Sequence, residues 1–367
     1  MKATYVYAII PTPDVPIRPD PVTADGRIHP HLFDVAGVDP DHDQVYCVPH
    51  NDIAAVISAS PLTDYRGLNR REAAVYLVAH QRVVERVMRD SAVLPVKFGT
   101  ILPGKAAVHR LLAQGETLFH TALAKFAGLT QMEVVVLWKL QDIFQEIGQQ
   151  ELVVRLKAQI AGRPPEETMA ERVMLGQMVH ALLEQRRSTL RDQLLPPLQE
   201  GALDSVFNPP MDDSMVVNIA LLVDQEGRQA LDRRLELLDQ EHDGRLLFRC
   251  VGPLPPYSFA SVGVQTLSFQ EVDGARRRLE LGETATPGDI RQAYHRLATQ
   301  LHPDHSPDDP EAESHMAELT QAYQLLTAYT EGQAKEVADA GKAMYGFDRQ
   351  TVERTLLIAV YRQEIGL

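Results

Sequence analysis

The sequence predicts an α+β protein followed by a helical segment, and three observations lead to this prediction. Short β-branched and aromatic stretches alternate with longer amphipathic stretches up to about residue 251. Residues 252–259 then carry three prolines in eight positions, and each proline fixes its own φ and removes a backbone donor. Beyond this extended connector, apolar residues recur at helical spacing on both sides of a polar loop.

The first 130 residues are expected to form one α+β domain. Its strands are predicted at residues 3–10, 45–48, 53–58 and 93–100, and its helices from Asn69 onward and at 105–127. Pro95 indicates an edge strand or a bulge. Asn69 is expected to cap the first helix together with Glu72, in a capping box. The apolar stripe of that helix is predicted from Val75, Leu77, Val83, Val84, Val87 and Met88.

Residues 131–269 are expected to form a second domain. Strands are predicted at 132–138, 215–223 and 246–251, and helices at 139–200, interrupted near 162–165, and at 225–240. This succession of strand, helices, strand, helix and strand is typical of ferredoxin-like domains. The second helical piece, about 165–194, is amphipathic and can pack on a sheet or offer a groove to another helix. The connector at 252–259 is predicted to be neither helix nor central strand.

The composition favours a soluble, non-enzymatic protein. The chain has 367 residues and a net charge of −14, with no Lys/Arg cluster suited to nucleic acid. No apolar run approaches the roughly 20 residues that span a bilayer, and the first residues do not form a signal peptide, so a cytoplasmic location is expected. Neither a P-loop, a GxSxG motif nor a zinc signature occurs, so the chain is predicted to be no enzyme and to hold no cofactor or metal.

Several individual side chains could carry chemistry. The histidines and aspartates at 28–31 and 41–43 could ligate a metal, but their loose, proline-rich spacing favours a solvated loop. His80 is expected to be a hydrogen-bonded structural residue, because no nucleophile or acid partner for a general base is evident. Cys47 and Cys250 are expected to be reduced core thiols.

The segment after residue 269 is predicted to be a helical hairpin. A helix is expected at 270–282, and Thr286 then caps a second helix with Pro287 at its first position. Ile290, Tyr294, Leu297 and Leu301 share one face of this helix, which ends at His302-Pro303-Asp304. A further helix from about 310 presents Met316, Leu319, Tyr323 and Leu326. The tail, 331–367, is either a helix leading into an apolar strand or one amphipathic helix, and it could return to the first domain's sheet.

Two stretches of the body resemble a known family. The runs Leu-Pro-Val-Lys-Phe-Gly-Thr at 94–100 and Gly-Pro-Leu-Pro-Pro-Tyr-Ser-Phe at 252–259 are similar to those of the gas vesicle GvpL/GvpF family, as is the opening Tyr-Val-Tyr-Ala-Ile. The resemblance covers about residues 1–269. It implies two α+β domains, the second a modified ferredoxin-like fold, in an accessory protein that contacts the hydrophobic shell protein GvpA. Its motif residues, either structural or partner-binding, are Leu94, Pro95, Lys97, Phe98, Gly99, Gly252, Pro253, Pro255, Pro256, Tyr257 and Phe259.

The stretch 285–304, followed by Ala-Tyr-Gln-Leu-Leu at 322–326, resembles the J domain of DnaJ over about 270–330. This resemblance implies that His302, Pro303 and Asp304 engage a DnaK-class chaperone and stimulate its ATP hydrolysis. J domains usually carry several basic residues on the preceding helix, whereas here Arg291 and Arg296 are the only ones. Residues 283–330 hold eight acids and two arginines, a net charge of −6, so coupling to a chaperone could be weak, specialised or lost.

These expectations combine into one hypothesis and an alternative. The predicted parts are 1–130, 131–269, a J-like module at 270–330 and a tail at 331–367. The first hypothesis is a gas vesicle assembly factor that binds the shell protein and recruits a DnaK-class chaperone. The alternative is a minor structural or nucleation component of the vesicle with a vestigial J-like hairpin.

Overall fold

The computed structural model describes residues 3–12, 32–39, 44–62, 64–65, 67–301, 312–334 and 343–363. The contacts between residues divide the chain into two compact units. The first unit combines Met1–Lys125 with Ser261–Tyr361, and the second combines Phe126–Ala260 with Arg362–Leu367. The main segment of the second unit, Phe126–Ala260, is therefore inserted into the sequence of the first.

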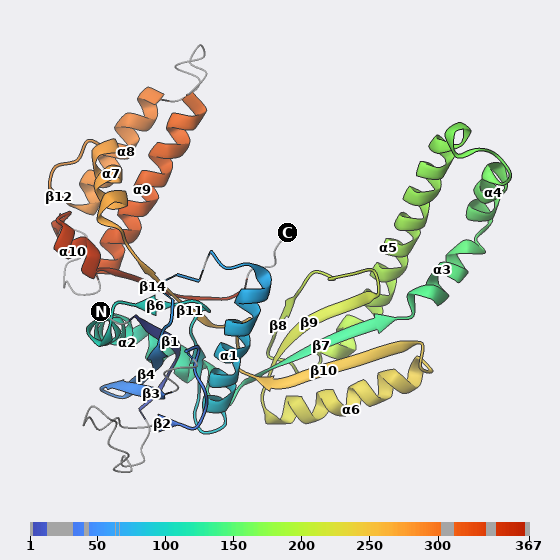
Figure 1. The fold of residues 1–367 in the computed structure, drawn as a ribbon, viewed down its shortest axis with the longest axis horizontal. Coiled ribbons are helices and arrows are strands. Elements are labelled where there is room, and N and C mark those ends of the chain that lie inside the picture. The colour runs from blue at the N-terminus through green and yellow to red at the C-terminus, as the bar shows by residue number, and fades with distance from the viewer. Residues whose placement is uncertain are drawn as a thin grey trace. The chain divides into compact units, whose positions relative to one another are not determined.

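An antiparallel sheet forms the centre of the first unit (Figure 1). Its strands are β1 (Thr4–Pro11), β2 (Leu32–Phe33), β3 (Val45–His50), β4 (Ile53–Ala59), β5 (Leu94–Pro95) and β6 (Ile101–Leu102). Their order is β2-β3-β4-β1-β5, and β6 also pairs with β1. All residues of β1 except Pro11 are buried, so this strand packs on both of its faces. Strand β2 was not predicted, because a strand of two residues has no detectable alternation.

Helices α1 (Arg70–Met88) and α2 (Lys105–Phe126) belong to this unit and confirm both predicted helices. The capping box of α1 is confirmed: Asn69 Oδ1 accepts from the Glu72 backbone N–H at 3.1 Å, and Glu72 Oε2 accepts from the Asn69 N–H at 3.2 Å. The predicted apolar stripe is wrong at its first turns. Val75 is 69% exposed and Leu77 38%, since the buried face of α1 begins at His80 and continues through Val83, Val84 and Val87.

The second unit contains a four-stranded antiparallel sheet. Its strands are β7 (Thr130–Trp138), β8 (Asp204–Phe207), β9 (Met215–Val223) and β10 (Leu246–Leu254), in the order β10-β7-β9-β8. Helix α6 (Gln225–Glu241) connects β9 to β10. The core is built from alternate residues of β7, such as Val134 and Val136, packed against Leu231 and Leu238 of α6. Strand β8 was not predicted, because it is short and only Val206 in it is fully buried.

Between β7 and β8 the chain forms a helical arm. The arm consists of α3 (Leu140–Gly148), α4 (Glu151–Ile160), a 3₁₀ turn at Pro165–Glu167 and α5 (Met169–Gln199). In Figure 1, α4 and the first half of α5 extend past the end of the sheet of this unit. The expected interruption near 162–165 is confirmed, and a second one separates α3 from α4 at residues 149–150.

The proline-rich stretch starts inside a strand rather than after it. Strand β10 continues to Leu254 with a register shift after Val251, and the irregular connector begins at Pro255. Strand β10 lies at an edge of its sheet, as expected for a strand that contains proline. One prediction is wrong in this strand: Cys250 was expected to be a core thiol, but it is exposed. Cys47, in the first unit, is buried as expected.

The C-terminal part of the first unit begins and ends in two paired strands. Strand β11 (Ser261–Thr266) pairs antiparallel with β14 (Leu356–Tyr361) along six residues. Val262 of β11 also lies beside β5, where its carbonyl accepts from the Lys97 N–H at 2.8 Å. Helix α10 (Arg349–Arg354) leads directly into β14. The tail is therefore a helix followed by a strand, and it returns to the first unit.

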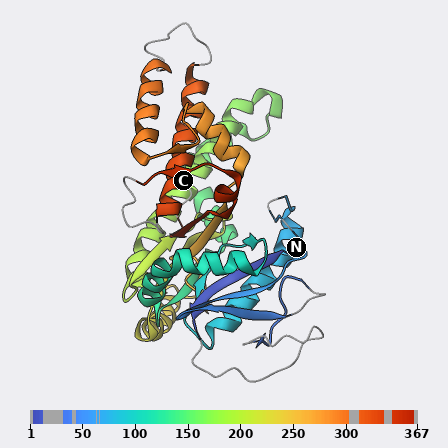
Figure 2. The same ribbon diagram turned by 90° about the vertical axis from the view of Figure 1, so that its left-hand side faces the viewer.

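A helical module lies between β11 and β14. It contains α7 (Phe269–Arg278), α8 (Pro287–Leu301) and α9 (Ala312–Ala334), with the short strands β12 (Thr284–Ala285) and β13 (Tyr345–Gly346). Figure 2 shows α8 and α9, in orange shades, side by side. Ile290 and Leu297 pack with Leu319 and Leu326, and the ring of Tyr294 stacks on that of Tyr323 at 4.4 Å. The predicted hairpin is confirmed over the described residues.

Candidate partner-binding sites

The motif at 94–100 is anchored in an aromatic cluster of the first unit. Leu94 and Pro95 are buried, whereas Lys97 is exposed. The Gly99 N–H donates to the Tyr5 hydroxyl at 2.9 Å, and the φ of Gly99 is +80°, which favours glycine. The Phe98 ring lies 5.7 Å from that of Tyr65. Most of this motif thus faces the protein itself, and Lys97 is its exposed residue.

His80 lies in the same cluster and is 2% exposed. Its Nδ1 lies 3.1 Å from the Tyr5 hydroxyl, and its ring stacks against that of Tyr7 and meets the edge of Phe98. Burial lowers the pKa of His80 from 6.5 to about 4. The imidazole is therefore neutral near pH 7, and the prediction of a structural, hydrogen-bonded histidine is confirmed.

The motif at 252–259 forms a tight turn at the end of β10. Gly252 and Pro253 are exposed, Pro255, Pro256 and Phe259 are buried, and Tyr257 is half-buried. The carbonyl of Pro256 accepts from the backbone N–H groups of Phe259 and Ala260. The buried side chain of Gln131, at the start of β7, accepts from the Ser258 N–H at 2.8 Å. These contacts hold the turn against the second unit's own sheet.

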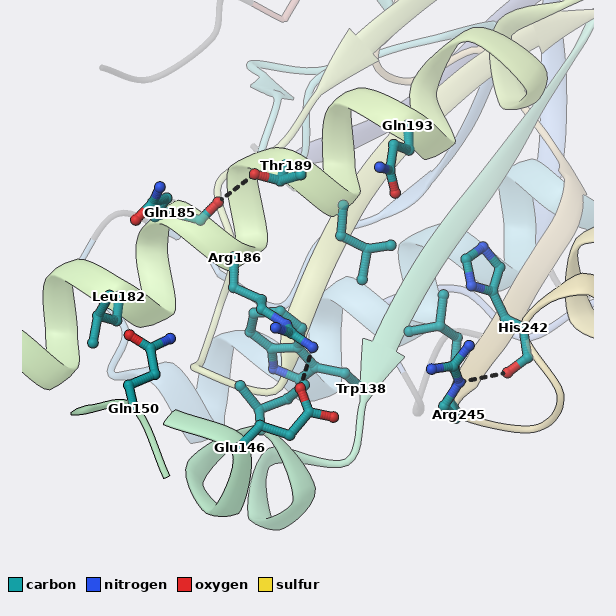
Figure 3. A pocket seen from close by; sticks show the side chains of 13 residues that line it. Trp138, Glu146, Gln150, Leu182, Gln185, Arg186, Thr189, Gln193, His242 and Arg245 are labelled. Carbon is teal, nitrogen blue, oxygen red and sulfur yellow. Dashed lines mark hydrogen bonds and ion pairs between the residues drawn. The ribbon is translucent and has the colours of Figure 1, made fainter. Parts of the chain in front are cut away.

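A groove of about 620 Å³ lies at the base of the helical arm, where neither motif contributes. Its apolar lining comes from Trp138, Ile143, Leu182, Leu190 and Leu246. Its polar lining comes from Glu146, Gln150, Gln185, Arg186, Thr189, Gln193, His242 and Arg245. Figure 3 shows the ion pair of Arg186 with Glu146 beside the indole of Trp138. We name this feature the arm groove. Its residues come from α3 and the link that follows it, α5, β7, the α6–β10 turn and the start of β10, so no single stretch of sequence could reveal it.

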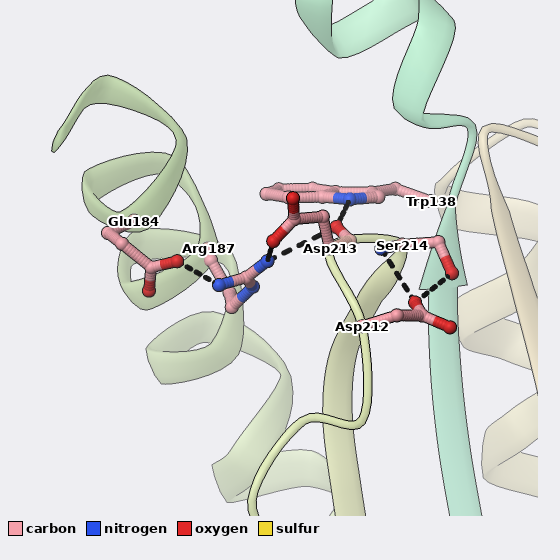
Figure 4. A network of polar contacts seen from close by, with 6 residues as sticks. All are labelled: Trp138, Glu184, Arg187, Asp212, Asp213 and Ser214. Carbon is pink, nitrogen blue, oxygen red and sulfur yellow. Dashed lines mark hydrogen bonds and ion pairs between the residues drawn. The ribbon is translucent and has the colours of Figure 1, made fainter. Parts of the chain in front are cut away.

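A polar network fixes the arm to the sheet next to this groove (Figure 4). Trp138 Nε1 donates to the Asp213 carbonyl at 2.7 Å, and Arg187 Nη2 donates to the same carbonyl at 3.2 Å. The guanidinium of Arg187 lies 5.8 Å from the centre of the Trp138 ring and also pairs with Glu184. In the neighbouring loop, hydrogen bonds from Ser214 hold the pKa of Asp212 below its usual range. Arg187 therefore joins α5 to the β8–β9 loop and to the end of β7.

Replacement of Arg187 by methionine is expected to lower the free energy of unfolding of the second unit by about 2 kcal/mol. The variant keeps most of the buried volume but loses the hydrogen bonds to Asp213 and the contact with the Trp138 ring. Trp138 is the only tryptophan in the chain, so urea unfolding followed by its fluorescence reports on this unit. Arg191→Met, one turn further along α5 and partly exposed, is the control and should change stability by less than about 0.5 kcal/mol. Equal effects of the two substitutions would contradict the anchoring role of Arg187.

Of the residues of the helical module that were predicted to contact a chaperone, the structure describes some and not others. Arg291 and Arg296 are exposed on α8, and Arg296 Nη2 pairs with Glu280 Oε2 at 2.6 Å. His302, Pro303 and Asp304 lie outside the described residues. The start of α8 is as predicted: Thr286 Oγ1 accepts from the Asp289 N–H, and the N–H of Thr286 donates to the Asp289 carboxylate, which lowers the pKa of that carboxyl. Arg296 is thus paired with Glu280, whereas no ion pair of Arg291 occurs among the described residues.

The described residues give no sign of a metal site or of a membrane span. Within 3–12, 32–39, 44–62, 64–65, 67–301, 312–334 and 343–363, no three His, Cys, Asp or Glu side chains gather closely enough to hold a metal ion. The candidate stretches 28–31 and 41–43 lie outside this part. None of the helices described has both the length and the apolarity needed to cross a bilayer.

Comparisons with known proteins match two separate parts of the chain. A family model for the gas vesicle synthesis protein GvpL/GvpF matches residues 3–261, and one for the DnaJ domain matches residues 277–334. The chain is 28% identical to gas vesicle protein L1 of Halobacterium salinarum over 236 residues, which are 60% of this chain and 82% of the relative. It is 22% identical to gas vesicle protein F of Microcystis aeruginosa over 262 residues, which are 70% of this chain and 98% of the relative.

The fold comparison agrees with the sequence comparison. The crystal structure of the gas vesicle protein GvpF from Anabaena sp. PCC7120 is similar to this chain with a TM-score of 0.53 and 22% identity, over 70% of this chain and 98% of that one. The module has its own relative: 49 residues are 45% identical to the chaperone protein DnaJ of Acidithiobacillus ferrooxidans, which covers 13% of each protein.

Proposed function

Because the chain belongs to the gas vesicle synthesis protein GvpL/GvpF family, we propose that it is an assembly factor which binds the hydrophobic shell protein GvpA and recruits a DnaK-class chaperone. The main observation in support of this proposal is the presence of a GvpL/GvpF body and a DnaJ domain in one chain. A shell protein that separates gas from water must expose large apolar faces, and such faces aggregate in water. A carrier with a net charge of −14 stays soluble while it binds them.

This proposal includes a cytoplasmic, vesicle-associated location and no catalytic activity of the chain's own. ATP hydrolysis would belong to the chaperone, and the chain would need neither metal nor cofactor. His302, Pro303 and Asp304 would contact the chaperone, supported by Arg291 and Arg296. The exposed Lys97 is the residue of the first motif that we assign to partner contacts, while the buried residues of both motifs maintain the fold.

We infer in addition that the second unit is a modified ferredoxin-like domain. Its elements follow the order strand, helix, strand, strand, helix, strand if α5 and α6 are taken as the two helices, and its sheet order β10-β7-β9-β8 is antiparallel throughout. The modification would be the addition of α3 and α4, which make the helical arm. The division into parts at 1–130, 131–269, 270–330 and 331–367 remains a prediction.

The alternative, a minor wall or nucleation component with a vestigial module, has one specific observation in its favour. On α8 the basic residues are Arg291 and Arg296, and Arg296 is already paired with Glu280. An acidic chaperone surface would therefore meet little free positive charge. Against it stands the packed core of the hairpin, from Ile290 to Leu326, together with the capping box at Thr286.

ATPase stimulation distinguishes the two readings. The purified full-length protein is expected to raise the steady-state ATPase rate of a DnaK from a gas-vesicle-forming bacterium several-fold, and His302→Gln is expected to abolish this increase. His315→Gln, an exposed histidine on α9 of the same module, is the matched control and should stimulate like the wild type. If the wild type leaves the ATPase rate unchanged, the recruiting function is refuted and the structural reading is favoured.

A further inference from the structure

The arm groove has the dimensions of a binding site for a helix. One of its walls is a single face of α5, formed by Leu182, Arg186, Leu190 and Gln193. From Leu182 to Gln193 there are 11 residue steps, which correspond to about 17 Å of helix and three turns. Ile143 and Glu146 of α3 form another wall, and Arg245 of the α6–β10 turn and Leu246 of β10 complete the lining on that side. Ridges of an added helix can pack into the groove that such a face leaves open.

The charges in the groove are unevenly distributed. Arg186 is neutralised by its ion pair with Glu146. Arg245 is exposed, and its Nε donates to the His242 carbonyl at 3.4 Å; within the described part of the chain no carboxylate forms an ion pair with it. Figure 3 shows Arg245 towards the Gln193 end of the groove, with Leu182 at the other end. The groove therefore combines apolar and polar lining residues with one positive charge that no carboxylate of the described residues pairs, on a protein of net charge −14.

We propose that the arm groove binds an amphipathic helix of about three turns, with its apolar stripe on Leu182, Leu190 and Trp138 and a terminal carboxylate side chain on Arg245. This inference rests on the proposed function for its occupant, a helical segment of the hydrophobic shell protein. Charge complementarity favours a segment with an acid next to its apolar stripe. A second copy of this chain is a poorer occupant, since each copy carries a charge of −14 and the two would repel.

Trp138 provides a direct measurement, because it lines the groove and is the only tryptophan of the chain. The full-length protein is titrated with two tryptophan-free 15-residue helical peptides, both with leucine at i, i+4, i+7 and i+11. One peptide carries glutamate in its first and last turns, and the other carries lysine there. The glutamate peptide is expected to change Trp138 emission saturably and to bind about tenfold more tightly than the lysine peptide.

The charge preference identifies the site. Arg245→Glu is expected to reverse the preference between the peptides, whereas Arg249→Glu, an exposed arginine on β10 outside the groove, is expected to leave it unchanged. Circular dichroism spectra of both variants, which are expected to match that of the wild type, control for folding. The proposal is overturned if neither peptide affects Trp138, or if the preference persists in Arg245→Glu. It is also overturned if Trp138 emission changes with protein concentration alone and light scattering shows a dimer, because a second copy would then fill the groove.

Co-expression with GvpA separates this inference from the function on which it rests. The wild type and Arg249→Glu are expected to co-purify with the shell protein, and Arg245→Glu is expected to lose most of it. If all three capture it equally, the shell protein binds elsewhere and the occupant is wrong. If the wild type captures none, the proposed function fails and the occupant fails with it, while the peptide titration still decides whether the groove accepts an acidic amphipathic helix.

Discussion

Acidification from pH 7 to pH 4 is expected to lower the free energy of unfolding of the first unit by about 3 kcal/mol through His80 alone. Burial lowers the pKa of His80 from 6.5 to about 4, so the unfolded chain binds a proton in this range that the folded protein does not. Protonation therefore stabilises the unfolded state. The loss begins as the pH falls below 6.5, and it levels off near pH 4, where the folded protein also takes up the proton.

The measurement is urea unfolding, followed by circular dichroism at pH 7, 5.5 and 4, for the wild type and for His80→Gln. The variant is expected to be less stable at pH 7, because the contact with Tyr5 is lost, but also less sensitive to acid. His109→Gln, an exposed histidine on α2 of the same unit, should keep the pH dependence of the wild type. Carboxylates titrate in all three proteins, so the difference between them isolates His80. Parallel pH profiles for wild type and His80→Gln would rule this explanation out.

Replacement of Gly252 by alanine is expected to destabilise the second unit by about 3 kcal/mol. The φ of Gly252 is +152°, a conformation that L side chains rarely adopt. A Cβ atom there would lie 2.5 Å from Met132 Sδ and 2.9 Å from the Gln131 carbonyl oxygen. Met132 is 3% exposed and part of the core, so its side chain has little room to withdraw. The expected cost combines backbone strain with overpacking.

Urea unfolding followed by Trp138 fluorescence tests this prediction in the unit concerned. Gly176→Ala is the matched control, since Gly176 lies inside α5 of the same unit and an added Cβ meets nothing within 4 Å. That substitution should stabilise the helix by up to about 1 kcal/mol, because alanine is the better helix former. A Gly252→Ala protein as stable as the wild type would show that the turn accepts a side chain.

The sequence allowed prediction of the elements whose determinants are local. The caps of α1 at Asn69 and of α8 at Thr286 each depend on four consecutive residues, and both were predicted correctly. The strands β7 and β9 are strongly apolar and were also recognised. By contrast, β8 begins with Asp204 and Ser205 and forms through its pairing with β9, which residues 204–207 do not encode by themselves.

Burial was harder to predict than secondary structure. Val75 and Cys250 are apolar and were expected to be buried, yet both are exposed. Val75 lies on an apolar stripe of α1 that is wider than the face of the helix that packs. Cys250 lies in an edge strand, which has a neighbouring strand on one side only. The polar network beside the helical arm depends on contacts between residues that are far apart in the sequence. Trp138 bonds to a residue 75 positions away, and Arg187 to one 26 positions away. A periodic pattern within a short window of sequence cannot indicate such contacts.

The direct pairing of β11 with β14 has a consequence for how this protein could be altered. An antiparallel pair brings the end of one strand next to the start of the other, so a two-residue hairpin turn could replace everything from 267 to 355. A different helical module could equally be spliced between the same two strands. The chain therefore offers a natural exchange position, at which the helical module can be removed or replaced while the polypeptide on either side keeps its course.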